Sequence, residues 1–262
     1  MTIKTIIFDW AGTTVDFGCM TPVMAFKNAF LEKEIHLTLD DIREPMGMLK
    51  RDHTATLLQL PNVQQQWHEK YGRLPEEGDI DAIYARFETL IFEDLAVNSS
   101  LKPDTLAVFQ ALKKAGYNIG TTTGYTSAMM AVVEKAAADA GYTPDFVATA
   151  DLTGNLGRPY PYMIYKNMAH FKSKSVHEVV KVGDTISDIQ EGLNAGIYSV
   201  GVTVGSSEMG LSLAEYEALP AAEQVALIQK VEEKFYAAGA DLCVNDLTAF
   251  LAKLPEIEAG MK

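Results

Sequence analysis

Short runs of β-branched and other apolar residues, which alternate with helical patterns, constrain the fold of this chain more than any other feature. Each run ends in small or polar residues, as strands do where they give way to loops. Such alternation predicts a Rossmann-like α/β core, that is, a mostly parallel sheet with helices on both faces. The predicted strands span residues 5–9, 117–123, 145–150, 178–184 and 198–204.

A helical insert separates the first two predicted strands. It holds about a hundred residues, far more than a crossover between neighbouring parallel strands requires. We therefore predict a core of residues 1–18 and 99–262 and an inserted helical cap domain of residues 19–98, with a return hinge at 98–103. The predicted cap helices cover residues 21–34, 45–59 and 79–96.

The chain beyond the insert follows the same alternation. A helix over residues 102–115 is predicted to end at Gly116, because glycine readily adopts the left-handed conformation that closes a helix. The C-terminal part predicts a helix, a short strand at 240–244 and a final helix, with no catalytic residue.

Composition restricts the possible partners. The chain has a net charge of −13 and an isoelectric point near 4.8, which argues against a broad nucleic-acid or anionic membrane surface. Cys19 and Cys243 lie too far apart for a CxxC metal motif. The N-terminal apolar run is too short for a secretory signal, and no run of about 18 apolar residues occurs. We therefore expect a cytoplasmic protein without nucleic-acid or membrane partners.

Three aspartates follow predicted strands at their carboxyl ends, the edge at which open α/β sheets bind ligands. Asp9 closes the first strand, and Asp184 and Asp188 follow the fourth. An isolated aspartate there can be a nucleophile, a metal ligand or only a helix cap. Several carboxylates around one point repel one another unless a cation lies among them, and hard oxygen ligands suit Mg²⁺. The group therefore predicts a magnesium site.

Two further loops offer groups for a phosphoryl ligand. Thr123 and Gly124 supply a hydroxyl, close backbone approach and N–H groups at the start of the next helix, although the pair can also serve as a helix cap. Arg158 adds a fixed cation that can bind phosphate oxygens, unless it is a solvated loop residue.

The insert contains an unusual segment, PMGMLKRDH. If this segment is helical, Met46, Lys50 and His53 share one face, so the lysine and histidine lie at an exposed edge or in a site. A lysine that faces a cleft indicates a Schiff base with a carbonyl substrate. Because an ordinary lysine is neutral in only about one molecule in 2,500 at pH 7, burial or nearby cations would have to lower its pKa.

The segments FDWAGTTVD, TTGYT, GRPYP and KVGDTISDIQEG occur in this order, with the helical insert after the first. Together they resemble the haloacid dehalogenase superfamily of aspartate-nucleophile enzymes. DWAGTT with PMGMLKRDH is similar to the phosphonoacetaldehyde hydrolase family within it. The resemblance, which covers residues 6–210, implies a Rossmann-like core with a helical cap, Mg²⁺ dependence, and hydrolysis of phosphonoacetaldehyde to acetaldehyde and phosphate.

The resemblance also implies a role for each matching residue. Asp9 corresponds to the nucleophile, and Lys50 corresponds to the lysine that forms the Schiff base. The implied metal ligands are Asp9, Asp184 and the backbone carbonyl of Ala11. The remaining implied roles are support of the metal site by Asp188, phosphoryl binding by Thr123, Gly124 and Arg158, assistance of imine formation by His53, and positions near the substrate for Met46 and Cys19.

Ala11 distinguishes this pattern from that of most phosphate-ester hydrolases of the superfamily. The resemblance implies that those enzymes carry an aspartate at this position, which protonates the leaving oxygen. Phosphonoacetaldehyde leaves through carbon, so an acid at that position does not help. An iminium on Lys50 does help, because it accepts the electrons of the breaking carbon–phosphorus bond and becomes a neutral enamine. Ala11 and Lys50 therefore form one argument for a carbon leaving group.

Two alternatives remain open at this level. One is a phosphomonoesterase or phosphomutase of the same superfamily, against which Ala11 and Lys50 argue. The other is a catalytically silent binding protein, against which the presence of Asp9, Asp184 and Lys50 argues. The family resemblance also implies a homodimer, and Met24, Phe26 and Phe30 either serve an interface or pack within the cap.

Overall fold

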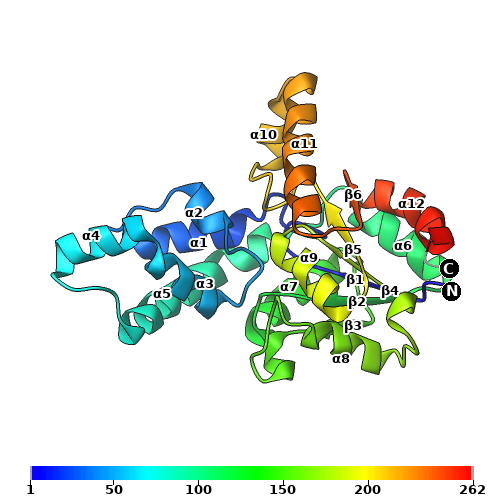
Figure 1. The fold of residues 1–262 in the computed structure, drawn as a ribbon, viewed down its shortest axis with the longest axis horizontal. Helices are drawn as coiled ribbons and strands as arrows, with labels where there is room; N and C mark the ends of the chain where they lie inside the picture. The colour runs from blue at the N-terminus through cyan, green and yellow to red at the C-terminus, as the bar shows by residue number, and fades with distance from the viewer. Residues whose placement is uncertain (1, 261–262) are drawn as a thin grey trace.

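A six-stranded sheet forms the centre of the molecule (Figure 1). This computed structural model describes residues 2–260, without the side chains of residues 96 and 97. The strand order is β3-β2-β1-β4-β5-β6 and every neighbouring pair is parallel, which confirms the predicted sheet. The strands are β1 (Thr5–Phe8), β2 (Asn118–Thr122), β3 (Phe146–Ala148), β4 (Val179–Gly183), β5 (Tyr198–Val202) and β6 (Leu242–Val244).

Helices cover both faces of the sheet because successive side chains of a strand point to opposite sides. Ile6 and Phe8 of β1 belong to the apolar cluster that contains residues of α6 (Thr105–Ala115) and α12 (Leu247–Gly260), and the Phe8 and Phe250 rings lie 6.0 Å apart. Ile7 belongs instead to the cluster with α8 (Tyr162–His170) and α9 (Ile186–Ala195). This two-faced burial holds β1, and with it the loop at its carboxyl end, at the middle of the core.

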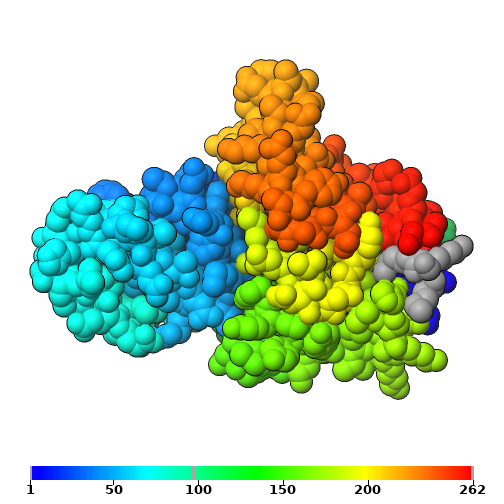
Figure 2. Space-filling view, in the orientation of Figure 1, coloured from blue at the N-terminus to red at the C-terminus, as the bar shows by residue number. Residues whose placement is uncertain are grey.

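The remaining core elements complete this arrangement. The glycine predicted to end α6, Gly116, does so with φ 90°. The third strand is shorter than predicted, because the chain turns into a 3-10 helix at Ala150. Helices α10 (Leu213–Ala218) and α11 (Ala221–Ala237) project away from the sheet (Figures 1 and 2). The other elements are α7 (Ser127–Asp139), η1 (Ala150–Thr153) and η2 (Val176–Glu178).

Of the six helices between β1 and β2, the first five form the second lobe of the molecule (Figure 2), and the sixth, α6, belongs to the core. The predicted helix over residues 45–59 is wrong at its start: it begins at Lys50, because Gly47 takes a φ of 90° and the preceding residues form turns. Phe26 and Phe30 are buried within this lobe, whereas Met24 is exposed. The helices are α1 (Met20–Leu31), α2 (Leu39–Arg43), α3 (Lys50–Gln59), α4 (Pro61–Tyr71) and α5 (Glu77–Asn98).

Two linkers join the lobes and pair with each other. Val15 and Leu101 form an antiparallel bridge, and the Lys102 N–H donates to the carbonyl of Thr14 at 2.9 Å. The second linker begins after Asn98, which is still the last residue of α5. Across residues 2–260, none of the helices is long and apolar enough to cross a membrane.

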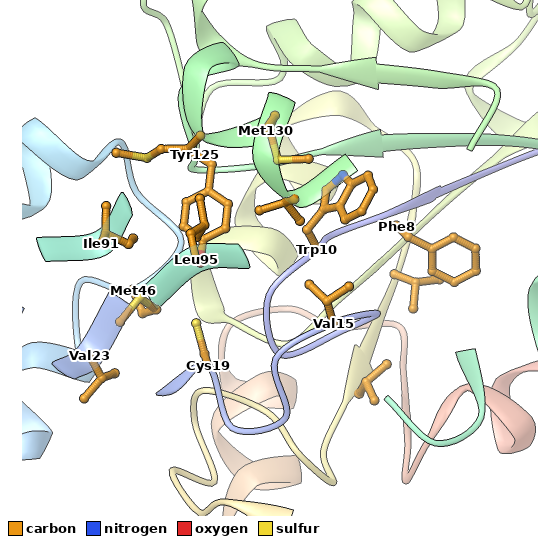
Figure 3. Close-up of a cluster of buried hydrophobic side chains, with 14 of the residues drawn as sticks. Phe8, Trp10, Val15, Cys19, Val23, Met46, Ile91, Leu95, Tyr125 and Met130 are labelled. Atoms are coloured by element: carbon orange, nitrogen blue, oxygen red, sulfur yellow. The ribbon is translucent and has the colours of Figure 1, made fainter. Parts of the chain in front are cut away.

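A single apolar cluster runs through the junction of the two lobes (Figure 3). Trp10 and Tyr125 enter it from the core, and Val23, Met46 and Leu95 enter it from the helical lobe. Removal of apolar surface from water is the main force that holds such a junction together. The structure therefore shows the helical lobe docked on the core.

Candidate active site

The candidate site lies where β1, β2 and β4 end at one edge of the sheet. Asp9, Thr123 and Asp184 each follow one of these strands, and the loop between α2 and α3 covers them from the helical lobe. A small pocket remains between the two sides. It is lined by Asp9, Ala11, Cys19, Met46, Gly47, Lys50, Thr123, Gly124, Tyr125, Arg158 and Thr185.

Three buried carboxylates lie beneath and beside this pocket. One oxygen each of Asp9, Asp184 and Asp188 lies within 4.8 Å of the others. Thr13 Oγ1 and the Ser207 N–H each donate to Asp184 at 2.8 Å. Burial raises the pKa of Asp184 well above its usual range, and the charges of Asp9 and Asp188 raise it further. Ionisation of all three carboxyl groups is therefore unfavourable by itself, and a bound cation would stabilise the ionised form.

Gly12 allows the loop after β1 to approach Asp184 this closely. Its φ is 90°, a conformation that other residues rarely adopt, and a Cβ atom there would overlap the Asp184 carboxylate. The sequence places a glycine where both the backbone angle and the space require one.

Arg158 is held by three carboxylates: Asp9, which follows β1, and Asp188 and Glu191, which both lie on α9. Its Nη2 donates to Asp9 Oδ1 at 2.6 Å, its Nη1 lies 3.1 Å from Asp188 Oδ1, and its Nε donates to Glu191 Oε2 at 3.1 Å. Burial alone would lower the pKa of Arg158, but Asp188, Asp9 and Glu191 outweigh it and raise that pKa. The guanidinium is thus a permanent charge of fixed orientation beside Asp9.

Arg158 is supported by a buried lysine and glutamate that the sequence motifs did not indicate. Lys181 of β4 is fully buried, and its Nζ lies 2.8 Å from Asp188 Oδ1 and 3.4 Å from Glu191 Oε2. Thr122 Oγ1 accepts from Lys181 at 2.7 Å and from Arg158 at 2.9 Å. A signal was present: a lysine within the apolar run EVVKVGD, and Glu191 three residues after Asp188 on the buried face of α9.

The charges of the site divide into a matched set and an unmatched set. Arg158 and Lys181 contact Asp188 and Glu191 and match them in number, so Asp9, although it also pairs with Arg158, and Asp184 are the two carboxylates in excess among these six side chains. The carboxylates of Asp9 and Asp184, with the backbone carbonyl of Ala11, offer the hard oxygen ligands that Mg²⁺ prefers. The residues therefore fit a divalent cation held by Asp9 and Asp184, with Asp188 occupied by its own cations.

Lys50 enters the pocket from the first turn of α3. Its Nζ lies 3.7 Å from Met46 Sδ and 5.4 Å from the centre of the Tyr125 ring, and only 4% of the residue is exposed. Burial lowers the pKa of Lys50, although the charge of Asp9 opposes this shift. Met46 precedes the helix but still contacts Lys50. The turn before α3 therefore places these two side chains side by side, as the predicted helix would also have done.

His53 lies one turn further along α3 and does not line the pocket. The centre of its ring lies 4.0 Å from that of Phe26, with the two ring planes tilted by 32°, and neither ring nitrogen has a hydrogen-bond partner among residues 2–260. Burial lowers the pKa of His53 well below its usual range, and Lys50 lowers it further. The histidine is therefore a neutral, buried group next to the site.

The loop of the helical lobe touches the core through backbone atoms. A Cβ atom on Gly124 would lie 2.7 Å from the carbonyl oxygen of Met48, and one on Gly47 would lie 2.5 Å from Thr185 Oγ1. Such spacing is closer than a side chain permits, so both glycines are needed for the contact. The sequence does not predict this role of Gly47, because the spacing of its neighbours is typical of a helix.

Three further side chains shape the pocket between Asp9 and Lys50. Thr123 Oγ1 accepts from the Tyr125 N–H at 3.1 Å. Tyr125 lines the pocket although the sequence did not single it out. Cys19 precedes α1 in the left-handed conformation, and burial raises the pKa of its thiol well above the usual range. Cys19 is therefore an uncharged thiol on the pocket wall.

Known proteins resemble this chain over nearly its whole length. Residues 3–196 match the haloacid dehalogenase-like hydrolase family. A phosphonoacetaldehyde hydrolase of Lysinibacillus sphaericus is 46% identical over 247 residues, which cover 94% of this chain and 92% of that protein. A phosphonoacetaldehyde hydrolase of Bacillus anthracis is 41% identical over 258 residues, with 98% and 97% coverage.

The fold agrees with these matches. The crystal structure of a phosphonoacetaldehyde hydrolase-like protein from Oleispira antarctica superposes with a TM-score of 0.95 at 33% sequence identity. The alignment covers 100% of this chain and 94% of that chain. The chain is therefore an enzyme that belongs to the haloacid dehalogenase-like hydrolases and, within them, to the phosphonoacetaldehyde hydrolase family.

Proposed function

We propose that the chain hydrolyses the carbon–phosphorus bond of phosphonoacetaldehyde to acetaldehyde and phosphate. The main support is one pocket that holds a carboxylate, Asp9, and a buried lysine, Lys50, with Ala11 at the position where an ester hydrolase needs an acid. The names of the aligned relatives agree with this substrate. A phosphate ester would gain nothing from a lysine that can form an imine.

The reaction begins at Lys50. Its lowered pKa increases the fraction of neutral amine, which attacks the aldehyde carbon and expels water to give an iminium. We assign His53 to assist this step, as a neutral imidazole one turn away on the same helix. The apolar surroundings of Lys50 limit the access of bulk water to the iminium.

Asp9 then takes the phosphoryl group. One of its oxygens attacks phosphorus, the carbon–phosphorus bond breaks, and the bonding electrons move into the iminium to give a neutral enamine. Arg158 and Thr123 stabilise the oxygens of the transferred group, because fixed donors around developing charge lower the barrier. Protonation of the enamine carbon and hydrolysis of the imine release acetaldehyde and restore Lys50. A second water releases phosphate from Asp9.

Mg²⁺ is the cofactor that the oxygen set fits, held by Asp9, Asp184 and the Ala11 carbonyl, with Asp188 as support. A bound divalent cation supplies charge neutralisation at the phosphoryl oxygens. Removal of divalent metal with a chelator should abolish phosphate release, and added Mg²⁺ should restore it. Activity that survives chelation would contradict this assignment.

Trapping of the imine tests the whole proposal. Borohydride added with phosphonoacetaldehyde should leave a reduced two-carbon adduct on Lys50, found by peptide mass spectrometry, and activity should be lost. The exposed Lys27 of α1 is the internal control and should remain unmodified. Acetaldehyde release without any adduct on Lys50 would remove the imine from the mechanism.

We further propose that residues 19–98 act as a cap on a core of residues 1–18 and 99–262, and that the enzyme is a cytoplasmic homodimer. Both cysteines are free, which agrees with a reducing compartment. Sedimentation of the purified chain over a range of concentrations tests the dimer, and a species of monomer mass throughout would reject it.

A further inference from the structure

Arg43 is a buried cation of the helical lobe that the mechanism above does not use. It is the last residue of α2, and only 7% of it is exposed. Its Nη1 donates to the carbonyls of Gly18 at 2.9 Å and Ser207 at 3.0 Å, and its Nη2 donates to the carbonyl of Gly210 at 3.2 Å. One side chain thus joins α2, the first linker and the core loop that follows β5.

Arg43 lies directly before the loop that leads to Lys50, so its hydrogen bonds affect the position of that loop. Thr38 and Asp41 form a reciprocal capping box that fixes the start of α2. The loop that directly follows Arg43 carries Met46 into the pocket and ends at Lys50. Arg43 therefore anchors one end of the segment that delivers the lysine.

The core loop held by Arg43 also contacts the carboxylate layer. The Ser207 N–H donates to Asp184 Oδ2 at 2.8 Å, while the Ser207 carbonyl accepts from Arg43. The turn is closed by the Gly210 N–H, which donates to the Ser206 carbonyl at 3.1 Å. Gly210 has a φ of 76°, and a Cβ atom there would lie 2.9 Å from Arg43 Nε. The turn is thus shaped to receive the arginine.

We propose that Arg43 is a positioning residue, a latch that fixes the loop before Lys50 and the turn 206–210 in one docked arrangement. Hydrogen bonds from a charged donor to buried carbonyls are strong, and these break together when the lobe moves away. The latch also ties the Ser207 N–H to the orientation of Asp184. This coupling does not depend on the substrate; only its kinetic consequence rests on the proposed function.

Hydrogen exchange of the free protein tests the latch directly. In Arg43→Gln, amides of residues 206–210 and of the loop before Lys50 should exchange at least about tenfold faster than in the parent protein. Arg86→Gln is the matched control, because Arg86 pairs with Glu32 within the helical lobe. Exchange of the same amides in the control should stay within about twofold of the parent. Unchanged exchange in Arg43→Gln would overturn the proposal.

Arg43→Lys tests whether the hydrogen bonds of the guanidinium or only its positive charge protects these amides. Lysine keeps the positive charge, but one ammonium cannot bridge carbonyls on the linker and on both ends of the turn, so exchange should again accelerate. Parent-like exchange in Arg43→Lys would overturn the latch, since charge alone would then explain the glutamine variant. Loss of protection throughout the molecule in both variants would also overturn it, because Arg43 would then hold the fold as a whole.

The kinetic consequence is measured separately. With phosphonoacetaldehyde, kcat/KM should fall about tenfold in both Arg43 variants and stay at the parent value in Arg86→Gln. If the parent protein itself releases no acetaldehyde, the proposed function fails while the exchange result still decides the latch. Accelerated exchange with unchanged kcat/KM would overturn the role of Arg43 as a positioning residue.

Discussion

The core and the helical lobe both bury cations next to the pocket, but they give those cations different neighbours. In the core, Arg158 and Lys181 lie among Asp188 and Glu191, and each cation has a carboxylate within 3.1 Å. In the helical lobe, Lys50 lies beside a thioether and an aromatic ring. Carboxylates stabilise the charged form of a base, whereas burial among apolar groups favours its neutral form.

In the proposed mechanism the difference corresponds to two chemical tasks. A permanent positive charge beside Asp9 is suited to bind phosphoryl oxygens, and the raised pKa of Arg158 secures it. A nucleophilic amine must lose its proton, and the lowered pKa of Lys50 assists this loss. The core thus provides fixed charge, and the helical lobe provides a base that can be neutral.

The sharpest test of this comparison replaces the lysine by a cation that cannot become a nucleophile. Lys50→Arg should lower acetaldehyde release at least about 10³-fold, because arginine stays protonated and forms no imine. Lys27→Arg on the exposed face of α1 should have parent activity. Substantial activity in Lys50→Arg would show that Lys50 acts only through its charge.

A second aspartate should not compensate for the lost lysine. Addition of Ala11→Asp to a Lys50→Ala variant supplies a proton donor but no acceptor for the electrons of the carbon–phosphorus bond. Acetaldehyde release should therefore remain at the level of Lys50→Ala alone. Recovery of activity in the double variant would show that the leaving group needs a proton instead of an imine.

The core half of the comparison is tested by breaking its charge match. Lys181→Met or Glu191→Gln leaves one buried charge of the set Arg158, Lys181, Asp188 and Glu191 unbalanced, and each should lower the free energy of unfolding by about 3 to 5 kcal/mol. The double variant removes both charges, so its loss should be much smaller than the sum. Urea unfolding of the four proteins measures this coupling.

An exposed ion pair provides the control for that cycle. Lys135 and Asp139 pair on the surface of α7 with side chains 78% and 71% exposed, and their removal should change stability little. Additive losses for Lys181 and Glu191 would show that the two residues stabilise the core independently, and the description of a matched set would then be wrong.

The sequence predicted those parts of the site that depend on where each strand ends along the chain. Asp9 and Thr123 follow buried strands, and parallel strands bring their carboxyl ends to one edge, so proximity follows from topology. The sheet and the position of the helical insert follow from the same alternation. The docked position of that lobe does not, because it depends on tertiary contacts such as those of Gly47 and Gly124.

The parts that sequence missed depend on partners distant in the chain. Lys181 is visible as a lysine in an apolar run, but its pairing with Glu191 across strand and helix is not. The start of α3 was misplaced because Met46, Lys50 and His53 have helical spacing, while the left-handed angle at Gly47 overrides it. At this place the preference of glycine for a turn determines the structure, although the spacing of the neighbouring residues is that of a helix.

Asp16 lies in the first linker, between the two regions compared, and is a buried carboxylate. It accepts from the N–H groups of Met20 and Thr21 at 3.0 Å, at the start of α1. Burial raises the pKa of Asp16 to about 6, against a usual value of 3.8. The folded state therefore holds this proton more tightly than the unfolded chain does, and ionisation of Asp16 lowers stability.

The pH dependence of Asp16→Asn should follow from this shift. Below pH 4 both proteins carry an uncharged group, and their stabilities should be similar. Between about pH 4 and pH 6 the parent protein should lose up to about 3 kcal/mol relative to the variant, with no further change above pH 7. Denaturant unfolding at several pH values measures the difference. A constant difference across this range would mean that the raised pKa is absent.

His53 provides the smallest effect and tests whether a polar group of the helical lobe is kept for chemistry or for packing. Its buried ring nitrogens have no partner within the described part of the chain, so His53→Leu should leave the free energy of unfolding unchanged or raise it by about 1 kcal/mol. If His53 assists imine formation, kcat should still fall about tenfold or more. Trp67→Phe removes another buried, unpartnered donor of the same lobe and should leave kcat unchanged. A His53→Leu protein that is less stable but has the kcat of the parent would instead make His53 a packing residue. A histidine kept for chemistry is expected to lower the stability of the parent protein and to raise its kcat.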